Sequence, residues 1–200
     1  MTRLRFALGL TVLLLAALLF RHMGSFSPVA ARATDESTSC GSASLPTDLQ
    51  SRLKADYGTW KIQEAQTLSE HARRTWEGKK PPACPGVASG LFQGAKTRSH
   101  AVLLVPADHP DAGYRFLVFN RKDEQSSYEA TVVEQSDDKG ASNYFIRKVP
   151  VSRFFDEASK KKFQVQAAEA ILMTDSAEQE YEADLYFWSN GRFQQHPVDE

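Results

Sequence analysis

The stretch HAVLLVPADHPDAGYRFLVF, residues 100–119, decides the fold of this chain. It contains two apolar runs, 100–105 and 114–119, on either side of a turn rich in proline and aspartate. A continuous apolar run of this length, bounded by turn residues, is typical of a strand buried on both faces. We therefore predict two core strands joined by a turn.

Further strand-like segments follow this pair at short intervals: 128–133, 143–149, 163–172, 181–188 and 192–195. Connections rich in Asp, Ser, Asn and Gly separate them, as hairpins require. The strongest turn signal is Asn190-Gly191, because this pair tolerates positive φ at both central positions. Consecutive hairpins at this spacing predict an antiparallel meander sheet of about six strands.

Helical patterns precede the strands. Leu49 and Leu53 recur at helical spacing before Gly58, which should end the first helix. Thr67, with a glutamate three residues later, matches a capping box and should begin a second helix that ends at Gly78. The predicted fold class is therefore α+β, with two N-terminal helices packed on the meander sheet.

The composition, 42% hydrophobic and 24% charged, is that of a globular protein. The net charge of −1 hides an asymmetry, because residues 1–33 hold four arginines and no acid. The remainder of the chain has 20 basic and 25 acidic residues. An acidic domain without a basic stripe is unsuited to neutralising phosphates, so nucleic acid is not an expected partner.

The first residues have the composition of an export signal. Arg3 and Arg5 precede an apolar core, residues 6–20, which matches the apolar region of a signal peptide and is slightly short for a membrane-spanning helix. Ala31-Arg32-Ala33 is a small-x-small cleavage site, although it lies far from the apolar core. A cleaved signal peptide and a retained N-terminal membrane anchor therefore both remain open.

These features predict three parts. Residues 1–33 are the signal peptide or anchor, residues 34–45 a linker rich in Ser, Ala and Thr, and residues 46–200 a single α+β domain. The predicted location is periplasmic or extracellular, or anchored to the membrane by residues 6–20. The only predicted contact with a membrane is through this segment, if it is not cleaved.

The chain has two cysteines, Cys40 and Cys84. In an oxidising compartment a single pair suggests one disulfide, which would tie the linker to the start of the strand region. Two independent thiols are the alternative. Neither cysteine has a second Cys or His at the spacing of a metal site.

No known catalytic or metal-binding motif occurs in the sequence. There is no Gly-x-Ser-x-Gly elbow, phosphate-binding Gly-rich loop, HExxH motif or Cys–His cluster. The run Asp108-His109-Pro110-Asp111 has the composition of an ordinary tight polar turn. We therefore predict no catalytic residue, no metal and no cofactor.

Residues 86–105, GVASGLFQGAKTRSHAVLLV, resemble the calcium-loop segments of FG-GAP/VCBS type in small exported bacterial proteins. Gly90, Phe92 and Gly94 match the glycines and aromatic residue of that loop, and residues 101–104 match the strand after it. At the family's acidic positions this chain has Leu91, Gln93, Ala95 and Ser99. A loop without carboxylates lacks the hard oxygen ligands that calcium requires. The resemblance therefore implies the turn-then-strand geometry without the metal.

The leading hypothesis is a non-enzymatic binding module of the cell envelope, whose partner is an envelope protein or a glycan. His100, Tyr186 and Trp188 are the candidate binding residues, at a strand edge and at the aromatic end of the chain. One alternative is a structural envelope component. Another is a small secreted hydrolase or inhibitor-like protein, in which a histidine such as His100 would meet a carboxylate in a cleft.

Overall fold

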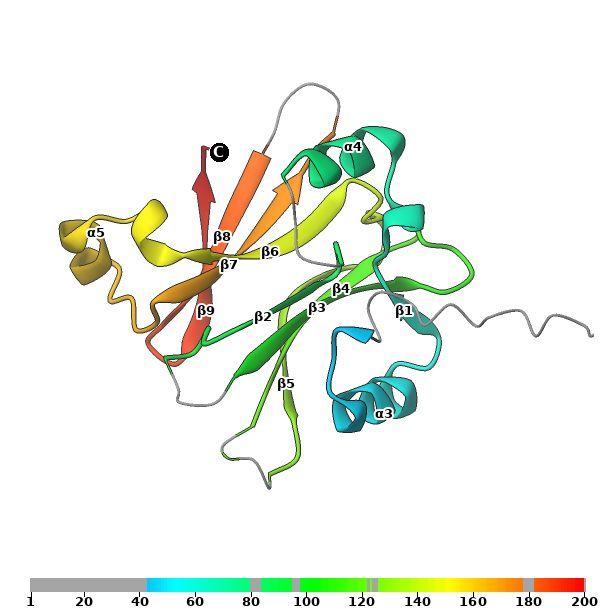
Figure 1. Ribbon diagram of the computed structural model, residues 1–200, viewed down its shortest axis with the longest axis horizontal. Coiled ribbons are helices and arrows are strands. Elements are labelled where there is room, and N and C mark those ends of the chain that lie inside the picture. The colour runs from blue at the N-terminus through cyan, green and yellow to red at the C-terminus, as the bar shows by residue number, and fades with distance from the viewer. Residues whose placement is uncertain are drawn as a thin grey trace, which may run out of the picture. The chain divides into compact units, whose positions relative to one another are not determined.

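The strand region forms two antiparallel sheets instead of the single meander predicted from the sequence (Figure 1). The computed structural model describes residues 43–79, 84–94, 98–121, 123, 126–177 and 182–199. All of them belong to the compact unit Thr38–Glu200. Within these residues the protein is α+β, as predicted, with short helices before and between the strands.

The first sheet, sheet A, contains the predicted central pair. β3 (Ser99–Pro106) pairs with β4 (Tyr114–Asn120), and β4 pairs with β5 (Glu129–Ser136). On its other side, β3 pairs with β2 (Val87–Gly90) along its first half and with β1 (Trp60–Ile62) along its second half. β3 and β4 are almost entirely buried, as their apolar runs predicted.

The second sheet, sheet B, consists of four strands in chain order. These are β6 (Tyr144–Pro150), β7 (Glu169–Asp175), β8 (Glu182–Ser189) and β9 (Arg192–Val198). The turn between β8 and β9 is the one predicted, because Asn190 and Gly191 have φ values of 51° and 77°. Positive φ at both positions gives the twist that a two-residue hairpin needs.

The predicted strand 163–172 is wrong in its first half. α5 (Glu157–Lys162) ends just before residue 163, the chain then turns at Gln164, where φ is 51°, and β7 begins only at Glu169. Asp156 caps this helix, because its carboxylate accepts a hydrogen bond from the Ser159 amide at 2.7 Å. The three lysines in its last turn lie at the negative end of the helix dipole, where positive charge stabilises a helix.

The two sheets pack face to face around the main core. Leu103 and Phe116 of sheet A lie in one apolar cluster with Ile146, Ile171 and Tyr186 of sheet B. The rings of Phe116 and Tyr186 meet edge to face at 5.0 Å.

A main-chain hydrogen bond joins the two sheets at one edge. The amide of Ile146 donates to the carbonyl of Pro85 at 2.8 Å, which fixes the start of β2 against β6.

α3 (Thr47–Asp56) covers the outer face of sheet A. Its buried residues, Leu49 and Leu53, pack in a second apolar cluster with Leu104, Leu117 and Phe119. The i, i+4 spacing of the two leucines puts both on the face that meets the sheet. The first predicted helix is therefore confirmed in position and in its buried side.

α4 (Glu70–Gly78) begins later than predicted. Ser69 caps it, since its hydroxyl accepts a hydrogen bond from the Ala72 amide at 3.2 Å. Thr67 instead ends a short 3-10 turn, η1 (Ala65–Thr67), where its hydroxyl accepts a hydrogen bond from the Glu64 amide. α4 contacts β6 of sheet B, whereas α3 packs on sheet A.

The predicted signal or anchor (1–33) and residues 34–42 of the predicted linker lie outside the described residues. Among the residues that are described, no helix is long and apolar enough to cross a membrane.

Candidate functional site

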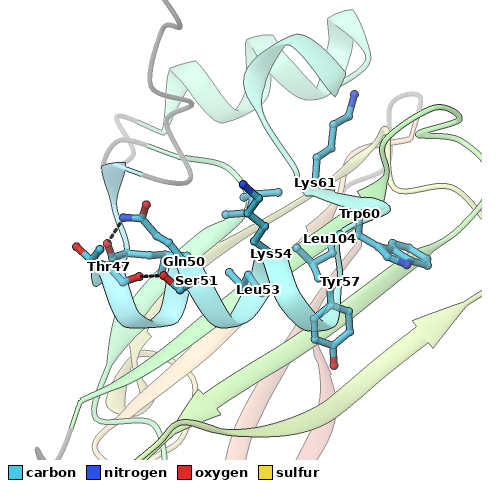
Figure 2. A pocket seen from close by; sticks show the side chains of 12 residues that line it. Thr47, Gln50, Ser51, Leu53, Lys54, Tyr57, Trp60, Lys61 and Leu104 are labelled. Atoms are coloured by element: carbon cyan, nitrogen blue, oxygen red, sulfur yellow. Dashed lines mark hydrogen bonds between the residues drawn. The ribbon is translucent and has the colours of Figure 1, made fainter.

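A groove of about 440 Å³ lies between α3 and β1 on the outer side of sheet A (Figure 2). Its size is in the range of small-ligand sites. We call it the α3–β1 groove, and its lining residues are Leu45, Thr47, Gln50, Ser51, Leu53, Lys54, Tyr57, Gly58, Trp60, Lys61, Ile62 and Leu104.

The periodicities of the helix and the strand create an apolar floor. Leu53 reaches the floor from α3, and Trp60 and Ile62 reach it from β1, on which alternate residues share a face. Leu104 completes the floor from β3, directly across from Ile62. The groove is therefore a place where α3 leaves part of the apolar face of sheet A uncovered.

The rim of the groove is polar and held in place. The Gln50 side chain donates to the Leu45 carbonyl at 2.8 Å, and the Ser51 hydroxyl donates to the Thr47 carbonyl at 3.0 Å. Two cations, Lys54 and Lys61, complete the lining, and neither forms an ion pair with another described residue. A ligand would thus meet an apolar surface with positive charge at its border.

The ring of Trp60, which borders the floor, and the ring of Tyr57 form the aromatic wall of the groove, and contacts from outside the groove hold both rings. The Arg115 guanidinium lies over the Trp60 ring at 4.6 Å and also pairs with Asp137. Tyr57 meets the Phe119 ring edge to face at 6.4 Å. These contacts hold the two rings before any ligand arrives, which lowers the entropy lost on binding.

The three predicted binding residues do not form one surface. Tyr186 is only 2% exposed and points into the core between the sheets. Trp188 is half-buried on the same strand, with its ring 5.1 Å from that of Phe193. His100 is 6% exposed on β3, a strand of the other sheet.

His100 contacts a hydroxyl. Its Nδ1 lies 2.8 Å from the Ser89 hydroxyl, across the β2–β3 pair. Burial, and then the charge of Arg98, lowers the pKa of His100, so the neutral ring is favoured. The contact satisfies two polar groups beside an apolar cluster, and it differs from the predicted histidine–carboxylate pair.

Sequence analysis missed a cluster of tyrosines and acids between the sheets. Tyr114 of sheet A and Tyr186 of sheet B both donate hydrogen bonds to the carboxylate of Glu134. Burial and the hydrogen bond to Glu134 raise the pKa of both phenols. A break in the β4–β5 register next to Phe116, the partner of Glu134, re-aims this part of the edge strand. The sequence contains no local signal for such a break.

The loop that resembles a calcium loop is attached to sheet B by a protein carboxylate. Glu169 accepts a hydrogen bond from the Leu91 amide at 2.7 Å and pairs with Lys148 at 2.9 Å. Phe92 is fully buried in the main core. Among the described residues, no group of three or more His, Cys, Asp or Glu side chains could hold a metal.

Cys84 is buried, with 3% of its surface exposed, and is not a free cysteine. Its predicted partner, Cys40, lies outside the described residues. The Cys40–Cys84 bridge therefore stays a prediction.

No protein-family model, curated protein or solved structure matches this chain.

Proposed function

We propose that this protein is an exported, non-enzymatic binding module that holds an apolar group of its partner in the α3–β1 groove. Export, with release or retention at the membrane by residues 6–20, rests on the arginine-flanked apolar segment at the N-terminus. The kinship with FG-GAP/VCBS proteins remains a prediction.

The observation that carries the proposal is the groove itself. It combines an apolar floor, an aromatic wall and a polar border, which is the composition of small-ligand sites in general. Among the described residues, its lining contains two lysines and one tyrosine, and no His, Cys, Asp or Glu side chain. The side chains that most often act as nucleophiles or as general acids and bases are therefore absent from the lining, which supports binding over catalysis.

A hydrolase is less well supported. Among the described residues, His100 contacts the Ser89 hydroxyl and makes no hydrogen bond to a carboxylate, and neither residue belongs to the groove lining.

The proposal predicts that the fluorescent apolar anion 1-anilinonaphthalene-8-sulfonate binds saturably to the folded protein. Ser51→Trp should abolish this binding, because position 51 is exposed at the rim and an indole there would fill the groove. Ala55→Trp is the matched control, since Ala55 is an exposed residue of the same helix that does not line the groove. Fluorescence titration measures all three proteins.

Equal binding by the two tryptophan variants, or no saturable binding by the wild type, would overturn the assignment of the groove. Circular dichroism must show the same folded content in all three, because the dye also binds loosely packed states.

A further inference from the structure

We propose that the partner's binding element is an extended peptide that adds to β1 as an outer strand. It would place apolar side chains in the α3–β1 groove and acidic side chains beside Lys61. This inference rests on the proposed function and names the class of partner for the same groove.

β1 has an open edge. Within the described residues it pairs with β3 alone and ends the strand order of sheet A. The Ala107 amide donates to Thr59, and the Gln63 amide donates to Leu103, both at 2.9 Å. Bonded and non-bonded residues alternate in an antiparallel pair, so Lys61 is also bonded to β3.

The residues on either side of Lys61 must then direct their main-chain groups away from β3. The Trp60 amide is bonded to the Tyr57 carbonyl at 2.8 Å. Among the described residues, none pairs with the carbonyl of Trp60 or with the main-chain groups of Ile62, so these groups lie along the outer edge. A peptide strand needs such free main-chain N–H and C=O groups along an edge in order to pair with a sheet.

The groove lies beside this edge. Residues of α3 line one side of it, and all three residues of β1 line the other (Figure 2). Peptides add to an exposed sheet edge, where main-chain hydrogen bonds give affinity and pockets for alternate side chains give specificity. The α3–β1 groove supplies such a pocket beside β1. A peptide could use both the α3–β1 groove and the edge of β1, whereas a small amphiphile would use only the groove. The two features together therefore favour a peptide.

The two faces of β1 differ, and this sets the pattern of the peptide. Trp60 and Ile62 pack in the cluster that contains the leucines of α3, so they face the helix. Lys61 lies between them on the strand, and Figure 2 shows its side chain pointing away from α3. Side chains of an added strand alternate in the same way, so residues facing α3 should be apolar and those beside Lys61 acidic.

The experiment is selection from a phage-displayed library of random peptides against the folded wild-type chain, with Ser51→Trp as the counter-selection. The expected result is a set of peptides in which apolar and acidic residues alternate. Synthetic copies should lose about tenfold in affinity when one edge-facing backbone amide is N-methylated, since a main-chain hydrogen bond is removed. Methylation of the neighbouring amide, which faces away from β1, is the matched control.

Lys61→Glu tests the charge pattern without touching the groove floor. It should weaken the selected peptides by about fivefold, as expected for an exposed charge pair, and weaken them less in high salt. Lys79→Glu, an exposed charge change outside the groove lining, should leave their affinity unchanged.

Two outcomes would overturn the addition of a peptide strand to β1. Peptides that bind equally well after N-methylation at every position would overturn strand addition and leave the groove as a side-chain site. Failure to enrich any peptide over the Ser51→Trp variant would also overturn it. In both cases the dye titration shows whether the groove still binds an apolar group, so failure of the proposed function is recognised separately.

Discussion

Gly86 shows how a single residue determines the edge of sheet A. A Cβ atom at this position would lie 2.5 Å from the Gln63 carbonyl oxygen and 2.9 Å from the Gln63 amide nitrogen. Gln63 follows β1 and Gly86 precedes β2, and the main chains of both bond to Leu103 of β3. Only glycine allows the two backbones to approach this closely.

Gly86→Ala should therefore lower the free energy of unfolding by about 1–3 kcal/mol, the usual cost of overpacking. Gly78→Ala is the control, because its new Cβ would meet nothing within 4 Å at the end of α4. That change should be neutral or raise stability by about 0.5–1 kcal/mol. Urea unfolding measures both, and equal stability of the two variants would refute the close approach.

Sequence reasoning at the residue scale succeeded where the signal is local. Asn190-Gly191 was predicted correctly because its turn geometry depends on those two residues. Tyr186 is a predicted contact residue, but it is buried. Its burial was not predictable, because the alternation of residues 181–188 does not indicate which face of the strand meets the core. Glu134 was missed because its inward position depends on the irregular pairing with β4.

At the scale of elements, the start of α4 differs from the one that the sequence predicts. The capping-box pattern favoured Thr67, whereas the structure places Ser69 at the cap. The Ser69 hydroxyl also donates to the Asn143 side chain at 2.7 Å, and the Ser69 amide donates to the Ser142 carbonyl at 2.7 Å. These long-range contacts fix the helix start, and a sequence pattern cannot show them.

Ser69→Ala should reduce the free energy of unfolding by about 1 kcal/mol, because an amide in the first turn of the helix loses its partner. Ser69→Thr retains a hydroxyl and should recover most of the loss. Thermal unfolding followed by circular dichroism provides the comparison. If threonine is no better than alanine, the hydroxyl does not act as the cap.

The strands were predictable as elements, but their arrangement was not. Residues 114–119 became β4 with little change, since a buried apolar run indicates a strand locally. The division into two sheets depends on which edges pair across the chain, as in the bond between Ile146 and Pro85. The α3–β1 groove was unpredictable for the same reason, because it exists only after α3 packs on sheet A.

For the whole molecule, three buried tyrosines of the main core, Tyr114, Tyr144 and Tyr186, link stability to pH. Burial is the main cause that raises the pKa of Tyr114, Tyr144 and Tyr186 above the ordinary value. Below pH of about 10 these phenols are protonated in both the folded and unfolded states, and their contribution is fully present. Above that pH only the unfolded state releases the protons, so stability falls as pH rises.

Tyr144→Phe should make this fall less steep by about 1.4 kcal/mol per pH unit, the effect of one proton. Urea unfolding at a series of alkaline pH values measures the slope, and ultraviolet absorbance shows tyrosinate formation. An unchanged slope in the variant, or tyrosinate formation by Tyr144 in the folded protein near pH of about 10, would contradict the burial argument.

The α3–β1 groove is the central claim at this scale, because among the described residues it is where packing leaves an apolar surface uncovered beside the outer edge of β1. The most direct test is backbone-amide NMR of the folded chain during titration with 1-anilinonaphthalene-8-sulfonate. We predict saturable shifts concentrated in α3 and β1, between Thr47 and Ile62, with sheet B unaffected. Shifts centred on β8 and β9, or no saturable shift, would contradict the account.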